Sequence, residues 1–189
     1  PTQVHLFPED GSWKELAGYL LEGFPVDVNA LDESQQFMLV SLMIGVRAPD
    51  TEGHSVGNLA QLRQLHSDPS AIEQYAHSLR GPDDNGAQGN GLAVEGIRQT
   101  LRLLFHDAYL TSLDDPLDQL ISAPFYMDYY GVVEVEVFAP MYLLGRAAHC
   151  VQDSFAHTIR TDQDKLRKIV HVLNYVEAIS TGFDEDRDG

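Results

Sequence analysis

The segment Arg146–His157 constrains the fold more than any other part of the chain, because it spaces His149, Asp153 and His157 four residues apart. In an α-helix each step of four residues overshoots one turn by about 40°, so the three side chains share one face. Each step also rises about 6 Å, which separates the two histidines by roughly 12 Å along the axis. One ion is hard to reach from both, whereas two ions could share Asp153. The spacing predicts a helix with a multinuclear metal site, although histidines at helical spacing also occur by chance.

Helical patterns dominate the rest of the chain. Capping residues and apolar periodicity predict helices over about 12–23, 29–48, 56–66, 69–79, 97–105, 139–159 and 162–180. The segment Val132–Phe138 alternates apolar and acidic residues as a β-strand does, but the surrounding helical patterns outweigh that signal. We expect an all-α fold, a single compact helical domain of about seven to nine helices around a multinuclear metal cleft, over residues 1–183.

Composition and charge limit the function classes. The 189 residues are 43% hydrophobic, which suits one domain with a substantial core, and a single cysteine rules out an internal disulfide framework. The formal net charge of −17 repels phosphate backbones, so duplex nucleic acid is not an expected partner. No apolar run is long enough to span a membrane. A start at Pro1 suggests a processed or trimmed product, and we expect a secreted or periplasmic protein whose signal peptide is not present in this chain.

A second histidine-bearing segment could complete the metal site. A tight turn near 160–162 would pair the last two predicted helices antiparallel. At 1.5 Å per residue, Asp153 then lies about 10 Å from the turn and His171 about 13 Å, so the two stand at the same level. Imidazole and carboxylate ligands suit zinc first, ahead of iron and manganese. Histidines also occur upstream; His66 and His77 could face the same centre, and we expect His106, within an apolar helix, to be structural.

Two segments resemble a known family. Leu144–Thr158 is similar to a motif of the zinc-dependent phospholipase C family of bacteria, in the branch with the form R-A-x-H-x-x-Q-D-x-x-x-H, and Gln74–Arg80 resembles a ligand-bearing helix of that branch. The resemblance implies an all-helical domain with a trinuclear zinc cluster, in which Asp153 bridges two ions and is the candidate catalytic residue. The metal ligands that it implies are His5, His54, His66, His77, His149, Asp153, His157 and His171.

The chain departs from this family at two ligand positions. The family places an N-terminal Trp on a metal, and this chain begins with Pro1. The family also has an acidic residue four positions after the histidine equivalent to His171, where this chain has Tyr175. On the predicted helix Glu177 points about 120° away from His171, which makes it a poor substitute. The expected complement is therefore two or three zinc ions.

The resemblance and the chemistry of zinc together predict a metal-dependent phosphodiester hydrolase. The first expectation is a phospholipase C that cleaves glycerophospholipid headgroups with a hydroxide on zinc and touches the membrane surface transiently. One alternative is a single-strand nuclease of the same fold. Another is a non-catalytic, metal-stabilised helical domain of a larger protein. Residues 184–189 favour this last alternative. They form an acidic tail or the start of a calcium loop, and the candidate calcium ligands are Asp184, Asp186 and Asp188.

Overall fold

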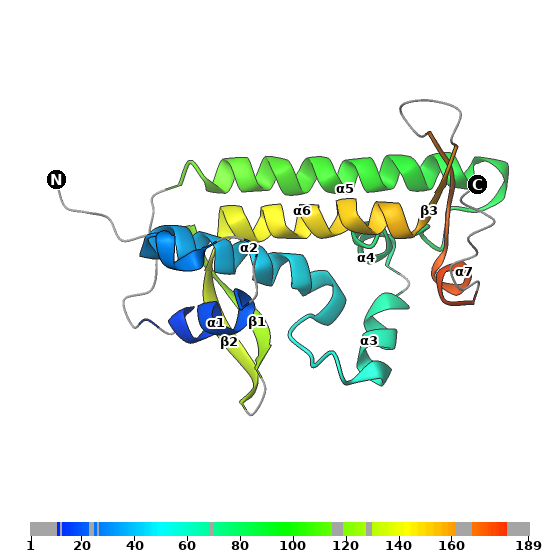
Figure 1. The fold of residues 1–189 in the computed structure, drawn as a ribbon. Coiled ribbons are helices and arrows are strands. Elements are labelled where there is room, and N and C mark those ends of the chain that lie inside the picture. Colours follow the sequence, from blue (N-terminus) through cyan, green and yellow to red (C-terminus); the bar gives the residue numbers. More distant parts are fainter. Residues whose placement is uncertain are drawn as a thin grey trace.

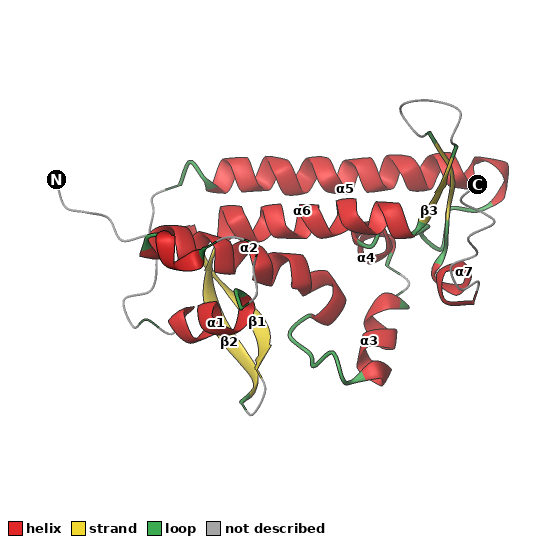
Figure 2. Cartoon of the chain, viewed as in Figure 1, coloured by secondary structure: helices red, strands yellow, loops and turns green. Residues whose placement is uncertain are grey.

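The computed structural model describes residues 11, 13–22, 25, 27–68, 70–114, 119–127, 130–161 and 168–180. These residues form helices and two β-hairpins (Figure 1, Figure 2). The elements are α1 Trp13–Leu20, the 3₁₀ helix η1 Val28–Ala30, α2 Glu33–Thr51, α3 Leu59–His66, α4 Ala71–Ala76, the 3₁₀ helix η2 Gly86–Gln88, α5 Gly89–Thr111, β1 Leu120–Met127, β2 Gly131–Phe138, α6 Ala139–Ala156, β3 Thr158–Arg160, β4 Ile169–Val172 and α7 Tyr175–Ser180. The expected all-α fold is wrong, because four of these elements are strands.

Helix α6, which carries His149 and Asp153, lies between α5 and α2 (Figure 1). It ends at Ala156 and not at the predicted residue 159, so His157 is its C-cap residue and the strand β3 follows at once. Cys150 of α6 packs with Ala93 and Ile97 of α5 in one hydrophobic core. Phe37 and Ile44 of α2 belong to a second core, beneath the β1–β2 hairpin. Among the described residues, no helix combines the length and the hydropathy that a membrane span requires.

Helix α2 extends further at its C-terminal end than the sequence pattern predicts. It begins at a capping box in which Asp32 accepts from the backbone of Gln35 at 2.9 Å and the Gln35 side chain accepts in return at 3.0 Å. We expected the helix to end before Pro49, but it continues to Thr51 and ends at Glu52, whose φ of 40° is left-handed. A proline in the last turn removes one backbone donor without breaking the helix. The extra turn carries Asp50.

Two glycines allow α2 and α6 to cross with their backbones in contact. A Cβ atom at Gly45 would overlap the carbonyl oxygen of Tyr142, and one at Gly145 would overlap the carbonyl oxygen of Leu42. These obstacles are backbone atoms, which cannot rotate aside as a flexible side chain can. The crossing therefore sets how closely Asp50, five residues after Gly45, approaches α6.

The β1–β2 hairpin shows that the alternation in Val132–Phe138 was a true strand signal. Its register runs from Leu120 opposite Phe138 to Met127 opposite Gly131. Val135 and Val137 face the core and are 9% and 0% exposed. An amphipathic strand needs only one covered face, and the core beneath it supplies that cover even in a largely helical protein.

The predicted final helix over 162–180 is also wrong. Residues 162–167 lie outside the described part, and Ile169–Val172 forms β4, paired antiparallel with β3 so that His171 stands opposite Ile159. Three of these four residues are β-branched, which favours a strand over a helix. Only the short α7 remains helical, so His171 does not lie on a helix paired with α6.

The glycine crossing can be tested with one methyl group. Gly145→Ala should destabilise the protein by about 1–3 kcal/mol, because the added Cβ meets backbone. Gly18→Ala is the matched control; it lies on an exposed face of α1 with nothing within 4 Å of its added Cβ, and should stabilise by up to about 1 kcal/mol. Urea unfolding measures both. Equal stability changes for the two variants would contradict the close crossing.

Candidate metal centre

Four side chains bring metal-ligating atoms within 4.8 Å of one another, namely those of Asp50, His77, His149 and Asp153. Asp50 lies in the last turn of α2, His77 caps the C-terminal end of α4, and the other two lie one turn apart on α6. The imidazoles of His77 and His149 are buried, whereas both carboxylates are partly exposed. The cluster thus has a closed imidazole side and a carboxylate side that reaches solvent.

The distances among three atoms of the cluster are those between neighbouring ligands of a coordination tetrahedron. Zinc with ligands at about 2.0–2.1 Å holds neighbouring ligand atoms about 3.3 Å apart. His77 Nδ1 lies 3.2 Å from His149 Nε2, and Asp153 Oδ2 lies 3.3 Å and 3.0 Å from these two nitrogens. Asp50 Oδ1 lies 3.8 Å from His77 Nδ1 and 3.6 Å from His149 Nε2. Three of the atoms thus have the spacing of zinc ligands, and Asp50 Oδ1 lies slightly farther out, with all four within 4.8 Å of one another.

A hydrogen-bonded cluster without a cation accounts less well for this arrangement. Both ring nitrogens contact the same oxygen, Asp153 Oδ2, and both also lie near Asp50 Oδ1. Without a cation, either two N–H groups crowd one oxygen or a nitrogen lone pair faces a carboxylate. A cation at the centre makes all four contacts favourable, because every atom then offers it a lone pair. The donor set therefore fits a divalent metal ion.

Two further histidines flank the cluster in the orientation typical of metal ligands. His66 Nδ1 lies 2.7 Å from the carbonyl oxygen of Leu62, and His157 Nδ1 lies 2.7 Å from that of His77. Because a carbonyl only accepts, Nδ1 donates in each ring, and the lone pair of the neutral ring is on Nε2. Metal-bound histidines usually anchor their other nitrogen in this way. His66 Nε2 lies 3.2 Å from Asp50 Oδ1.

The local electrostatics favour positive charge at the cluster. Burial raises the pKa of Asp153, but hydrogen bonds from His149 and His77 outweigh it and bring the pKa well below its usual range. Burial likewise raises the pKa of Asp50, and the hydrogen bond from His66 reverses the shift. Hydrogen bonding to Asp50 raises the pKa of His66 in turn. Both carboxylates are thus ionised at neutral pH.

The C-terminal ends of four helices add negative potential at the cluster. The last turns of α2 and α6 carry Asp50 and Asp153, α3 ends at His66, and α4 ends immediately before His77. The C-terminal end of a helix carries partial negative charge, which stabilises a nearby cation.

The structure places His171 in a different polar network. Arg80 donates from Nη2 to His171 Nδ1 at 3.0 Å, and because arginine only donates, the imidazole proton is on Nε2. Nε2 lies 3.3 Å from Glu177 Oε2. Glu177, which seemed poorly placed on a continuous helix, reaches His171 because the chain turns between β4 and α7. Burial raises the pKa of Glu177, and hydrogen bonds from the Asn174 backbone and from His171 lower it below its usual value.

The remaining candidates from the sequence lie apart from the four-atom cluster or outside the described residues. His54 Nε2 lies 2.9 Å from the side-chain amide nitrogen of Gln61. His106 is exposed on α5 beside Asp107. The candidates outside the described residues are His5, Asp184, Asp186 and Asp188.

Asp50 is the cluster member that sequence reasoning missed. It follows Pro49, before which the sequence predicted the end of the helix, and so it was not among the candidate ligands. A helix continued by one turn past the proline would have placed this carboxylate at a helix end. Comparisons with protein-family models, curated proteins and solved structures find no match for this chain.

The centre predicts metal binding that depends on α6. The purified protein should bind at least one divalent ion per chain, and Asp153→Asn should weaken zinc affinity by at least about a hundredfold, because it removes a charged ligand. His106→Ala, an exposed histidine on α5, is the control and should bind as the wild type. Competition with a chromophoric chelator measures the affinities. Unchanged affinity in Asp153→Asn would contradict the site.

Proposed function

We propose that this protein is a zinc-dependent phosphodiester hydrolase of the phospholipase C type. The observation that carries the proposal is the convergence of Asp50, His77, His149 and Asp153 on one point. The site is also asymmetric, since the Asp50 side chain is 48% exposed and that of His77 is 2% exposed. These four ligands alone would fill a tetrahedron, so water would enter on the solvent side as a fifth ligand or by displacing the exposed Asp50 carboxylate, as hydrolytic zinc chemistry requires.

The roles of the residues follow from their positions. A zinc ion held here would polarise a phosphoryl oxygen and lower the pKa of a coordinated water toward about 7. His77 and His149 would hold the ion from the buried side, and the ionised Asp50 and Asp153 would offset its charge. The two or three ions of the full proposal would add sites beside His66 and His157. The Nδ1 anchoring of His157 leaves its Nε2 for a metal, whereas Nε2 of His66 would exchange its hydrogen bond to Asp50 for the ion.

The strong negative charge of the chain is compatible with an anionic substrate. A formal charge of −17 repels a phosphodiester in solution. Bound divalent ions reverse the charge locally, so that phosphate is attracted to the centre alone. Of the alternatives, single-strand nuclease activity requires an extended, highly charged polymer to approach this surface, and lipid headgroups carry less charge. We therefore place glycerophospholipids first.

The proposal predicts hydrolysis that depends on the cluster. Zinc-loaded protein should cleave bis(p-nitrophenyl) phosphate and release phosphorylated headgroups from phospholipids, and chelation should abolish both activities. Asp153→Asn should lower kcat/KM by at least about a hundredfold, because a charged ligand of the centre is lost. His106→Ala should keep wild-type rates.

Three outcomes separate the alternatives. Headgroup release supports a phospholipase C. Cleavage of single-stranded DNA without lipid hydrolysis would reassign the site to a nuclease. A protein with zinc bound that hydrolyses none of these substrates would be a metal-stabilised domain, and the proposal of an enzyme would be wrong.

A further inference from the structure

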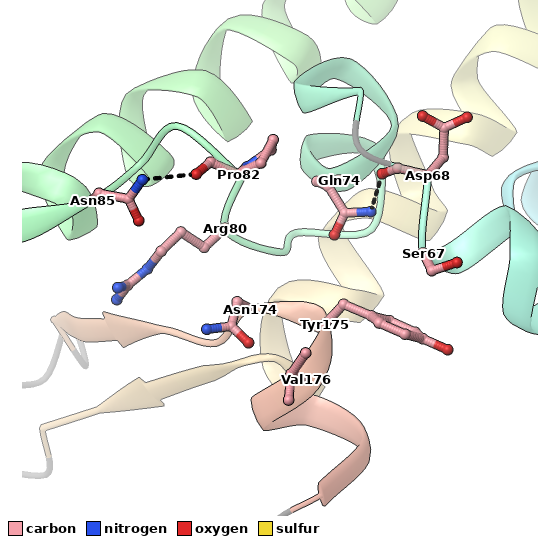
Figure 3. A pocket seen from close by; sticks show the side chains of 10 residues that line it. Ser67, Asp68, Gln74, Arg80, Pro82, Asn85, Asn174, Tyr175 and Val176 are labelled. Atoms are coloured by element: carbon pink, nitrogen blue, oxygen red, sulfur yellow. Dashed lines mark hydrogen bonds between the residues drawn. The ribbon is translucent and has the colours of Figure 1, made fainter.

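A pocket of about 490 Å³ opens between the α3–α4 connection, the loop after α4 and the start of α7 (Figure 3). Its volume lies within the range of small-molecule sites. Most of its lining residues have polar side chains, although the surface that they expose to the pocket is mostly apolar. The polar residues that matter for recognition are Ser67, Gln74, Arg80, Asn85, Asn174 and Tyr175.

The pocket is built from the same chain segments as the metal centre. Ser67 directly follows His66, and Arg80 comes three residues after His77. Gln74 is 4% exposed and donates from Nε2 to the carbonyl oxygen of His66 at 2.9 Å. A ligand in this pocket would therefore lie beside the segments that hold the cluster.

Hydrogen bonds within the protein determine which polar atoms remain for a ligand. Gln74 Nε2 donates to two carbonyl oxygens, so its Oε1 is left to accept. Asn85 Nδ2 donates to the carbonyl oxygen of Pro82, which leaves its Oδ1 as a second acceptor. Asn174 Oδ1 accepts from the backbone of Glu177, which leaves its amide nitrogen to donate. The wall thus offers both acceptors and donors, the combination that hydroxyl groups satisfy because each both donates and accepts.

Arg80 gives the pocket its positive charge. Its guanidinium donates to His171 Nδ1, which fixes its position, and its Nε is buried with no hydrogen-bond partner among the described residues. The group therefore has donor capacity that the protein itself does not use. The opposite charge of Glu177 lies on the far side of His171, with its Oε2 3.3 Å from His171 Nε2. Glu177 does not line the pocket.

The same wall is unsuited to a quaternary ammonium group. Such ligands are recognised by several aromatic faces, and Tyr175 is the one aromatic side chain among the described residues of the wall. Asp68 also borders the pocket, but its carboxylate accepts from the backbone of Ser70 at 2.7 Å and points away from Asn174 and Tyr175 in Figure 3. Arg80 would repel a fixed positive charge.

We infer that this pocket is the headgroup subsite of the proposed hydrolase, and that it selects hydroxyl-bearing headgroups such as glycerol or inositol over choline. The inference rests on the proposed function, since it names the substrate class of that site. Arg80 and Asn174 donate to headgroup oxygens, and Gln74 and Asn85 accept from headgroup hydroxyls. Arg80 determines the selectivity, because its charge excludes the trimethylammonium group.

Soluble dibutyroyl phospholipids test the inference without any effect of membrane charge. With the zinc-loaded full chain, kcat/KM for phosphatidylglycerol and phosphatidylinositol should exceed that for phosphatidylcholine by at least about tenfold. Arg80→Gln should bring this ratio close to one. Arg102→Gln, which removes an exposed arginine that pairs with Glu95 on α5, is the matched control and should keep the wild-type ratio.

The outcomes separate this inference from the proposed function. Equal or faster hydrolysis of phosphatidylcholine, or an unchanged ratio in folded Arg80→Gln, overturns the subsite and leaves the hydrolase intact. If no lipid is cleaved, calorimetric titration with glycerol phosphate, inositol phosphate and phosphocholine shows whether the pocket still binds hydroxyl-bearing headgroups more tightly than choline. Tighter binding of the first two supports the subsite and rejects only the hydrolase, whereas equal binding rejects both. The ratio of kcat/KM values that the wild-type protein shows between these lipids tests the inference even if Arg80→Gln does not fold.

Discussion

The backbone contact between α2 and α6 at Gly45 and Gly145 is the constraint on which the rest of the structure depends. With no side chains at the crossing, the two helices approach closely enough for Asp50 Oδ1 to lie 3.6 Å from His149 Nε2. Ser41 reinforces this arrangement one turn earlier, since its hydroxyl accepts from the backbone of Phe138 at 2.9 Å where α6 begins. A side chain at either glycine would separate the helices, and the carboxylate of α2 would no longer reach the imidazoles of α6.

The cluster beside this crossing could hold a metal ion, and it would then couple folding to metal binding. Two ionised carboxylates and two buried imidazoles converge in a protein that already has a formal charge of −17, and helix C-terminal ends add further negative potential. Such a concentration of negative charge and lone pairs is unfavourable by itself and favourable around a cation. Since these side chains come from segments far apart in the sequence, an ion held here would bind fully only when the chain has folded, and its binding energy would then stabilise the fold.

Local patterns in the sequence were correct where they were read over a few residues, and wrong where one pattern was extended over a long segment. The i, i+4, i+8 spacing placed His149 and Asp153 on one helix face, and both lie in the cluster with His77. His171 was assigned to a helix because one periodic pattern was extended through residues 162–180, although Ile169–Val172 is rich in β-branched residues. Val132–Phe138 shows the same error, since a strand signal was set aside in favour of its helical surroundings. In both places the local composition was the better guide.

By itself, the sequence determined which side chains share the face of α6, where most helices lie, and that imidazole and carboxylate side chains occur together on that face. These are consequences of spacing along one element, and the chain's own geometry enforces them. Only the tertiary structure decided that Asp50 completes the cluster, that His171 pairs with Arg80 and Glu177, and that a polar pocket opens next to His66 and His77. Those outcomes depend on how elements pack against one another. A missing Cβ at Gly45 or Gly145 changes that packing without leaving any trace in the helical periodicity.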